Sequence, residues 1–129
     1  MDLVFIVAIL AVIQFLAFGI LVGMARGKYD VPAPAVSGNP IFERYNRVQQ
    51  NTLEQLAIFL PAMFIYANLG DPRVAAGLGV VYLIGRLIYL RSYVKEPKSR
   101  GLGFAVTSLP GMFMLLASLF LAARNLIMA

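Results

Sequence analysis

Four long apolar segments, separated by short polar connections, dominate the chain. They lie at approximately residues 2–25, 47–69, 73–93 and 102–123. Each has about 20 residues or more, so at 1.5 Å per residue a helix of that length crosses a hydrocarbon core of about 30 Å. The runs are too long, and alternate too little, for the strands of a membrane β-barrel. The pattern predicts an all-α fold.

The segments extend into polar flanking residues, which places the predicted helices at about 2–25, 42–69, 73–95 and 102–123. Almost nothing is left over for a soluble domain. We therefore predict one transmembrane domain over residues 1–129, an integral membrane four-helix bundle. The connection Gly70-Asp71-Pro72 combines a helix stop with a restart, so the second and third helices should be antiparallel neighbours.

Composition supports a membrane protein and excludes several kinds of site. The 129 residues are 60% hydrophobic and 13% charged, which is more apolar than an ordinary soluble domain of this size. The chain has no cysteine and no histidine. This excludes disulfide bonds, Cys/His zinc sites and nucleophiles activated by histidine, and we expect no bound metal.

Basic residues predict the topology. Of the eleven, only Arg73 and Arg124 lie away from the first and third connections. By the positive-inside rule these two connections face the cytoplasm and both termini face the opposite side, across the cell inner membrane if the organism is bacterial. The net charge of +5 therefore follows from topology, with anionic lipid headgroups as further partners. No interleaving of basic and aromatic residues suggests a nucleic-acid surface.

The segment Phe42 to Glu54, FERYNRVQQNTLE, places polar residues at the mouth of the second apolar segment. Four of them follow one another at spacings of three, four and three, so they share a helix face about 80° wide. The opposite face is left to Val48 and Leu53. Ionisable groups at such depth are costly and indicate a functional site. The four residues are Arg44, Arg47, Asn51 and Glu54.

The third helix carries a second polar stripe. Tyr82, Arg86, Tyr89 and Tyr93 lie within about 60° of one another on a helix. Such a face could line a site for a polar ligand or form an aromatic belt at the membrane interface, and Arg86 favours the site.

On the first helix, Gln14 predicts an interhelical hydrogen bond, and the four-residue spacing of Gly19, Gly23 and Gly27 predicts close helix packing.

The charged groups on the cytoplasmic side indicate the chemistry of a ligand. A guanidinium group binds a carboxylate through two charge-assisted hydrogen bonds, and a glutamate suits an ammonium group. A molecule with two carboxylates and one amine would match Arg44, Arg47, Arg100 and Glu54. It would lie where apolar molecules dissolved in the bilayer can reach it.

These residues carry a family resemblance. FERYNRVQQNTLE resembles the E-R-x-x-R-A-x-x-N-x-x-E signature of the membrane-associated proteins in eicosanoid and glutathione metabolism (MAPEG). The resemblance extends from Arg26 to Arg100. The stripe from Tyr82 to Tyr93 is similar to the third helix of the leukotriene C4 synthase and microsomal glutathione transferase branch.

The resemblance implies a homotrimer that binds glutathione as co-substrate between adjacent subunits, in the cytoplasm-facing half of the membrane. It implies a glutathione transferase that conjugates lipophilic electrophiles, with lipid hydroperoxide reduction as a further activity. Arg100 matches the arginine that holds the thiolate and is the expected catalytic residue. The expected glutathione-binding residues are Arg26, Arg47, Gln49, Asn51, Glu54, Arg86, Tyr89 and Tyr93.

The sequence departs from the family pattern at three positions, which leaves alternatives open. Val48 replaces an alanine of the signature, Gln55 replaces a tyrosine of leukotriene C4 synthase, and Gly27 replaces its second catalytic arginine. One alternative is a non-catalytic lipid- or partner-binding membrane protein of the same fold. Another is a small exporter or channel, in which Glu54 would couple transport to protons.

Overall fold

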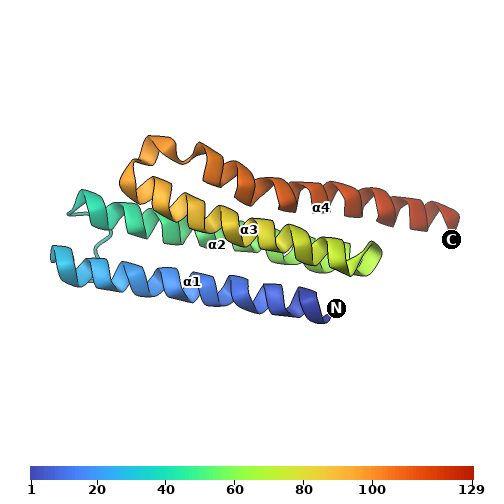
Figure 1. Ribbon diagram of the computed structural model, residues 1–129, viewed down its shortest axis with the longest axis horizontal. Coiled ribbons are helices and arrows are strands. Elements are labelled where there is room, and N and C mark those ends of the chain that lie inside the picture. The colour runs from blue at the N-terminus through green and yellow to red at the C-terminus, as the bar shows by residue number, and fades with distance from the viewer.

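The computed structural model describes residues 1–129 and contains four long helices, which run up and down side by side (Figure 1). Both termini lie at one end of the bundle, and the first and third connections lie at the other. Each long helix has the length and apolar composition needed to cross a membrane. The prediction of an all-α membrane four-helix bundle is confirmed. The elements are α1 (Asp2–Tyr29), α2 (Pro40–Leu69), α3 (Pro72–Lys95), η1 (Pro97–Ser99, a 3₁₀ turn) and α4 (Gly101–Met128).

The helices are longer than the apolar segments that predicted them. At its carboxyl end α1 continues to Tyr29 and α4 to Met128, and α2 already begins at Pro40. Hydropathy falls as soon as charged residues appear, whereas backbone hydrogen bonding continues through them. The ends of the helices therefore carry polar side chains into the regions where the connections lie.

Local capping residues fix where α2 and α3 begin. The Asn39 side chain accepts hydrogen bonds from the backbone nitrogens of Ile41 and Phe42, at 2.9 and 3.0 Å. The Asp71 side chain accepts one from the Arg73 nitrogen at 2.8 Å. In both cases a proline follows the cap, where its missing N–H costs nothing. Only Gly70 and Asp71 separate α2 from α3, so the two helices are the antiparallel neighbours that the sequence predicts.

The apolar core lies among α1, α2 and α3, towards the end of the bundle that holds the termini. Val4, Phe59 and Met63 are buried there. Tyr82 stacks on Phe59, with ring centres 4.0 Å apart and planes 6° from parallel. Gln14 of α1 donates a hydrogen bond to the Leu83 carbonyl of α3 at 3.0 Å, which confirms the predicted interhelical bond.

The closest contacts between helix backbones occur at glycines other than the predicted ones. Gly19 meets the Gln49 side chain, whose Nε2 lies 3.1 Å from the position of a β-carbon, whereas Gly23 and Gly27 have no neighbouring atom within 4 Å, so the close backbone approach predicted for that stripe does not occur within the chain. Instead, Gly85 of α3 faces the backbone of Thr107, and Gly103 of α4 faces the backbone of α3. The spacing of small residues was visible in the sequence, but which helix surface meets another depends on the assembled bundle.

Candidate functional site

A cavity of about 510 Å³ lies between α2, α3 and the beginning of α4, at the end of the bundle that holds the first and third connections. Its volume is in the range of small-molecule sites. Most of its lining residues are polar, which is unusual in so apolar a chain. They are Arg47, Asn51, Tyr89, Tyr93, Arg100, Gly101 and Phe104.

Helical spacing explains why these side chains converge. On α2, Arg47 and Asn51 are one turn apart, and on α3 Tyr89 and Tyr93 are one turn apart, so each pair projects from one face of its helix. The third connection then brings Arg100 to the same place. These five were all predicted site residues, and the structure brings them around one cavity.

Gly101 and Phe104 line the cavity but were not predicted. Phe104 stands one helical turn after Arg100, so the two share a face at the start of α4. That spacing was the signal that sequence analysis could have used. The pair gives the cavity a charged group beside an apolar ring.

Tyr89 and Tyr93 form one wall of the cavity. Their rings stack with centres 5.5 Å apart and planes 19° from parallel. Tyr89 is buried and also packs with Phe18 and Val48. The stacked rings are therefore held from the bundle interior while they border the cavity.

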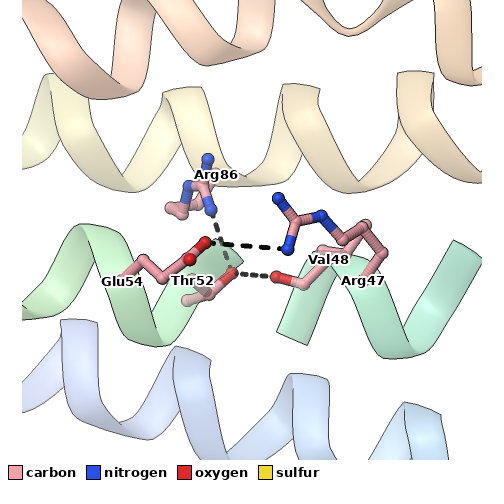
Figure 2. A network of polar contacts seen from close by, with 5 residues as sticks. All are labelled: Arg47, Val48, Thr52, Glu54 and Arg86. Atoms are coloured by element: carbon pink, nitrogen blue, oxygen red, sulfur yellow. Dashed lines mark hydrogen bonds and ion pairs between the residues drawn. The ribbon is translucent and has the colours of Figure 1, made fainter. Parts of the chain in front are cut away.

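Arg86 lies in the bundle interior against Tyr89 and does not line the cavity. Its side chain is completely buried, and its guanidinium carbon is 4.4 Å from the centre of the Tyr89 ring. Nε donates a hydrogen bond to the Thr107 hydroxyl at 3.1 Å, and Nη1 donates to the Thr52 hydroxyl at 3.0 Å. The Thr52 hydroxyl in turn donates to the Val48 carbonyl at 2.7 Å (Figure 2). The buried charge is thus held by two hydroxyls and one aromatic face, and it joins α2, α3 and α4.

Glu54 lies outside the cavity lining, on the exposed side of α2. Its carboxylate oxygen Oε1 is 3.9 Å from Nη1 of Arg47, two helical turns earlier (Figure 2). The two side chains are 60% and 49% exposed.

The helix face assigned to Val48 and Leu53 is not uniform, because Val48 is buried whereas Leu53 is 57% exposed. Packing of α2 against three other helices, rather than a single apolar stripe, decides which positions are covered.

Arg26 and Gln49 lie away from the cavity within one chain. Arg26 donates hydrogen bonds to the Ala35 and Val31 carbonyls of the first connection, at 2.6 and 3.3 Å. Its guanidinium carbon also lies 4.7 Å from the centre of the Phe42 ring. Gln49 faces Gly19 at the contact between α2 and α1. In this arrangement Arg26 orders the first connection and Gln49 packs between helices.

A smaller cavity of about 270 Å³ lies between the end of α1 and the start of α2. Five of its six lining residues are hydrophobic, and only Lys28 carries a charge. It lacks the converging polar groups that orient a polar ligand. The polar cavity bordered by Arg47 and Arg100 is therefore the candidate site.

The arrangement suits an anionic, flexible ligand. Arg47 and Arg100 present two guanidinium groups to the cavity, Asn51 presents an amide, and the tyrosines present phenols beside aromatic faces. Guanidinium groups bind carboxylates with charge-assisted hydrogen bonds. The chain has no cluster of three or more carboxylate, imidazole or thiol side chains that could hold a metal ion.

Comparisons with known proteins agree on one family. The model of the MAPEG family matches residues 4–120, which includes part of every long helix and the whole cavity lining. Microsomal glutathione S-transferase 2 of Homo sapiens is 40% identical over 101 residues, 78% of this chain and 69% of the human protein. Leukotriene C4 synthase of Bos taurus is 33% identical over 94 residues, 73% of this chain and 63% of the bovine protein. An uncharacterized protein of Synechocystis sp. is 47% identical over 110 residues, 85% of this chain and 80% of that protein.

Proposed function

The chain belongs to the MAPEG family, and on that basis we propose that it is a membrane glutathione transferase. The observation that carries the proposal is the convergence of Arg47, Asn51, Tyr89, Tyr93 and Arg100 around one cavity of about 510 Å³. Relatives in the family include a microsomal glutathione S-transferase and a leukotriene C4 synthase. Glutathione has two carboxylates, one ammonium group and one thiol, which is the ligand chemistry that these side chains fit.

The groups that line the cavity, together with Glu54 and Arg86 beside it, have separate proposed roles. Arg47 and Asn51 bind a carboxylate of glutathione, and Glu54, which lies beside Arg47, receives its ammonium group. Tyr89 and Tyr93 donate hydrogen bonds from their phenols and exclude water with their rings. Arg100 faces the thiol. Arg86 supports Tyr89 from the bundle interior and does not contact the ligand.

The chemical step depends on the ionisation of the thiol. A free thiol with a pKa of about 8.5 is only a few per cent ionised at pH 7, and the thiolate is the nucleophile. Lowering this pKa by about two units makes the thiolate the major form and requires roughly 2.7 kcal/mol of preferential stabilisation. A guanidinium group at hydrogen-bonding distance in a partly dry site can supply that energy. Arg100 acts as an electrostatic stabiliser and not as a base, because guanidinium keeps its proton in proteins.

The second substrate is a lipophilic electrophile that reaches the site from the bilayer. In conjugation, the thiolate sulfur forms a bond to the electrophilic carbon and the bonding electrons leave with the displaced group. A lipid hydroperoxide would instead lose its distal oxygen to the sulfur, which gives an alcohol after protonation and a glutathione sulfenic acid. A second glutathione would then convert the sulfenic acid to the disulfide and water.

We also propose a homotrimer with the first and third connections in the cytoplasm. The membrane topology follows from the basic residues near those connections. The exposure of Arg47 and Glu54 on an otherwise apolar span supports contact with a neighbouring subunit, because polar groups within a membrane normally face protein or water, and the number of three comes from the family resemblance alone. A neighbouring subunit would also bring Arg26 and Gln49 toward bound glutathione.

The test of the proposed function is ultraviolet difference absorbance on mixing glutathione with the detergent-solubilised protein. We expect a thiolate signal from the unsubstituted protein, a loss of most of it in Arg100→Ala, and partial retention in Arg100→Lys. Lys98→Ala is the matched control, because Lys98 is exposed and lies two residues from Arg100, and its substitution also removes one positive charge. Lack of a thiolate signal in the unsubstituted protein at physiological glutathione concentrations would favour a non-catalytic binding protein of the same fold.

A further inference from the structure

Arg44 makes a contact that the proposed chemistry does not use. It lies on α2, one turn before Arg47, and its side chain reaches across to the carboxyl end of α3. Its Nη1 donates hydrogen bonds to the Val94 carbonyl at 2.9 Å and the Lys95 carbonyl at 3.3 Å. Adjacent turns of α2 therefore present one arginine to the cavity and another to the end of α3.

The carbonyls that Arg44 binds are those a helix leaves without a partner. The last four carbonyls of a helix have no intrahelical donor, and the negative end of the helix dipole lies there. At the end of α3, the Glu96 nitrogen binds the Ser92 carbonyl at 2.8 Å, so that group is satisfied by the backbone. Arg44 supplies both hydrogen bonds and positive charge to the final two, Val94 and Lys95.

The end of α3 leads directly into the segment that carries Arg100. The Ser99 hydroxyl lies within hydrogen-bonding distance of two carbonyls, that of Ser92 at 3.0 Å and that of Glu96 at 2.7 Å, which folds η1 back against α3. The Arg100 nitrogen binds the Pro97 carbonyl at 3.4 Å, and Arg100 Nη1 donates to the same carbonyl at 3.1 Å. These hydrogen bonds tie η1 to the end of α3 and tie Arg100 to η1, so the position of Arg100 depends on where α3 ends.

We propose that Arg44 is a positioning residue for the thiolate: by binding the last carbonyls of α3, it fixes the third connection and holds Arg100 at the cavity. This inference rests on the proposed function. Arg44 itself does not line the cavity. Its removal should therefore change the ionisation of the bound thiol more than it changes glutathione affinity.

The experiment compares Arg44→Ala with the unsubstituted protein by thiolate absorbance as a function of pH. We expect the apparent pKa of the bound thiol to rise by about one unit, which lowers kcat about tenfold at a pH well below both the original and the raised pKa. Glutathione affinity should change by less than about threefold, because Arg47 and Asn51 remain in place. Arg44→Lys should restore most of the thiol ionisation, since lysine keeps the charge and a donor at the helix end.

Arg91→Ala is the matched control for the loss of one positive charge. Arg91 is exposed on α3 near the same end of the bundle, so its substitution should leave the thiol pKa unchanged. An equal shift in Arg91→Ala and Arg44→Ala would overturn the proposal in favour of a general charge effect. If Arg44→Ala is not recovered as folded protein, Arg44→Gln takes its place, because glutamine is longer than alanine and lacks the charge of arginine.

Amide hydrogen exchange separates this inference from the proposed function. In Arg44→Ala, the amides from Lys95 to Arg100 should exchange faster while those of α1 do not change. Unchanged exchange would show that Arg44 does not hold the connection, and faster exchange with an unchanged thiol pKa would show that the connection does not position Arg100. A lack of thiolate in the unsubstituted protein would contradict the proposed function instead, and the anchoring by Arg44 would then be judged from exchange alone.

Discussion

Gly103 of α4 lies directly against the backbone of Tyr89 of α3. A β-carbon at position 103 would come within 2.5 Å of the Tyr89 nitrogen and 2.6 Å of its α-carbon. Backbone atoms cannot move aside by a rotamer change, so only glycine permits this separation of the two helices. The contact therefore sets the distance between the tyrosines of α3 and Arg100 at the start of α4.

We expect Gly103→Ala to destabilise the protein by about 1–3 kcal/mol, the usual cost of forcing an extra methyl group into a packed interior. Because α4 must move away from Tyr89, thiolate formation should fall as well. Thermal unfolding in detergent measures the first effect, and ultraviolet difference absorbance with glutathione measures the second.

Gly77→Ala provides the control for this substitution. Gly77 is an exposed residue of α3 with nothing within 4 Å of a β-carbon. Alanine there should be neutral or stabilise the helix by up to about 1 kcal/mol. If the two variants unfolded at the same temperature, close packing at Gly103 would not be a determinant of stability.

The hydrogen bonds of buried Arg86 give a second prediction. In Thr107→Val the side-chain volume is nearly kept, but Nε of Arg86 loses its acceptor in a site that water does not reach. A buried donor without a partner costs about 1–3 kcal/mol, so the unfolding temperature should fall. Thr107→Ser keeps the hydroxyl and should be closer to the unsubstituted protein. A Thr107→Val variant as stable as Thr107→Ser would show that this hydrogen bond contributes little.

A third prediction separates binding from stability at Glu54. The ion pair between Glu54 and Arg47 is long at 3.9 Å and about half exposed, so Glu54→Gln should change the free energy of unfolding by less than about 1 kcal/mol. Glutathione affinity should nevertheless fall roughly tenfold, because the ammonium group of the ligand loses a charged acceptor. Isothermal titration calorimetry of the detergent-solubilised protein gives the affinity.

Asp2→Asn is the matched control for Glu54→Gln. It also replaces a carboxylate by an amide, but Asp2 lies at the start of α1, at the end of the bundle opposite the cavity. We expect no change in affinity. If both variants weakened glutathione binding equally, the effect of Glu54 would be one of net charge and not of a direct contact.

Much of the candidate site could be predicted because it depends on spacing within single helices. The pairs Arg47 with Asn51 and Tyr89 with Tyr93 share helix faces, and the structure places both pairs on the same cavity. The charge pattern already placed Arg100 among the ligand-matching groups, and family resemblance added its expected role at the thiolate. Periodicity predicts which side chains share a face, but not which face meets which.

The partners of the long side chains could not be predicted. Arg86 binds Thr52 and Thr107, which are 34 and 21 residues away in the sequence, and Arg44 binds carbonyls that are 50 and 51 residues away. Arg26 is a predicted site residue, and within one chain its partners are the Val31 and Ala35 carbonyls of the first connection. A flexible side chain can reach many groups, and only the folded bundle determines which are within range.

By itself, the sequence determined the all-α membrane fold, the short turn between α2 and α3 and the polar faces, because hydrophobicity, capping and helical period are local properties. Only the tertiary structure decided that Gly85 and Gly103, rather than Gly23 and Gly27, allow close packing. It also decided that Arg86 is buried while Arg47 borders the cavity. These outcomes depend on how the helices are rotated and spaced against one another, and that is fixed by contacts between residues far apart in the chain.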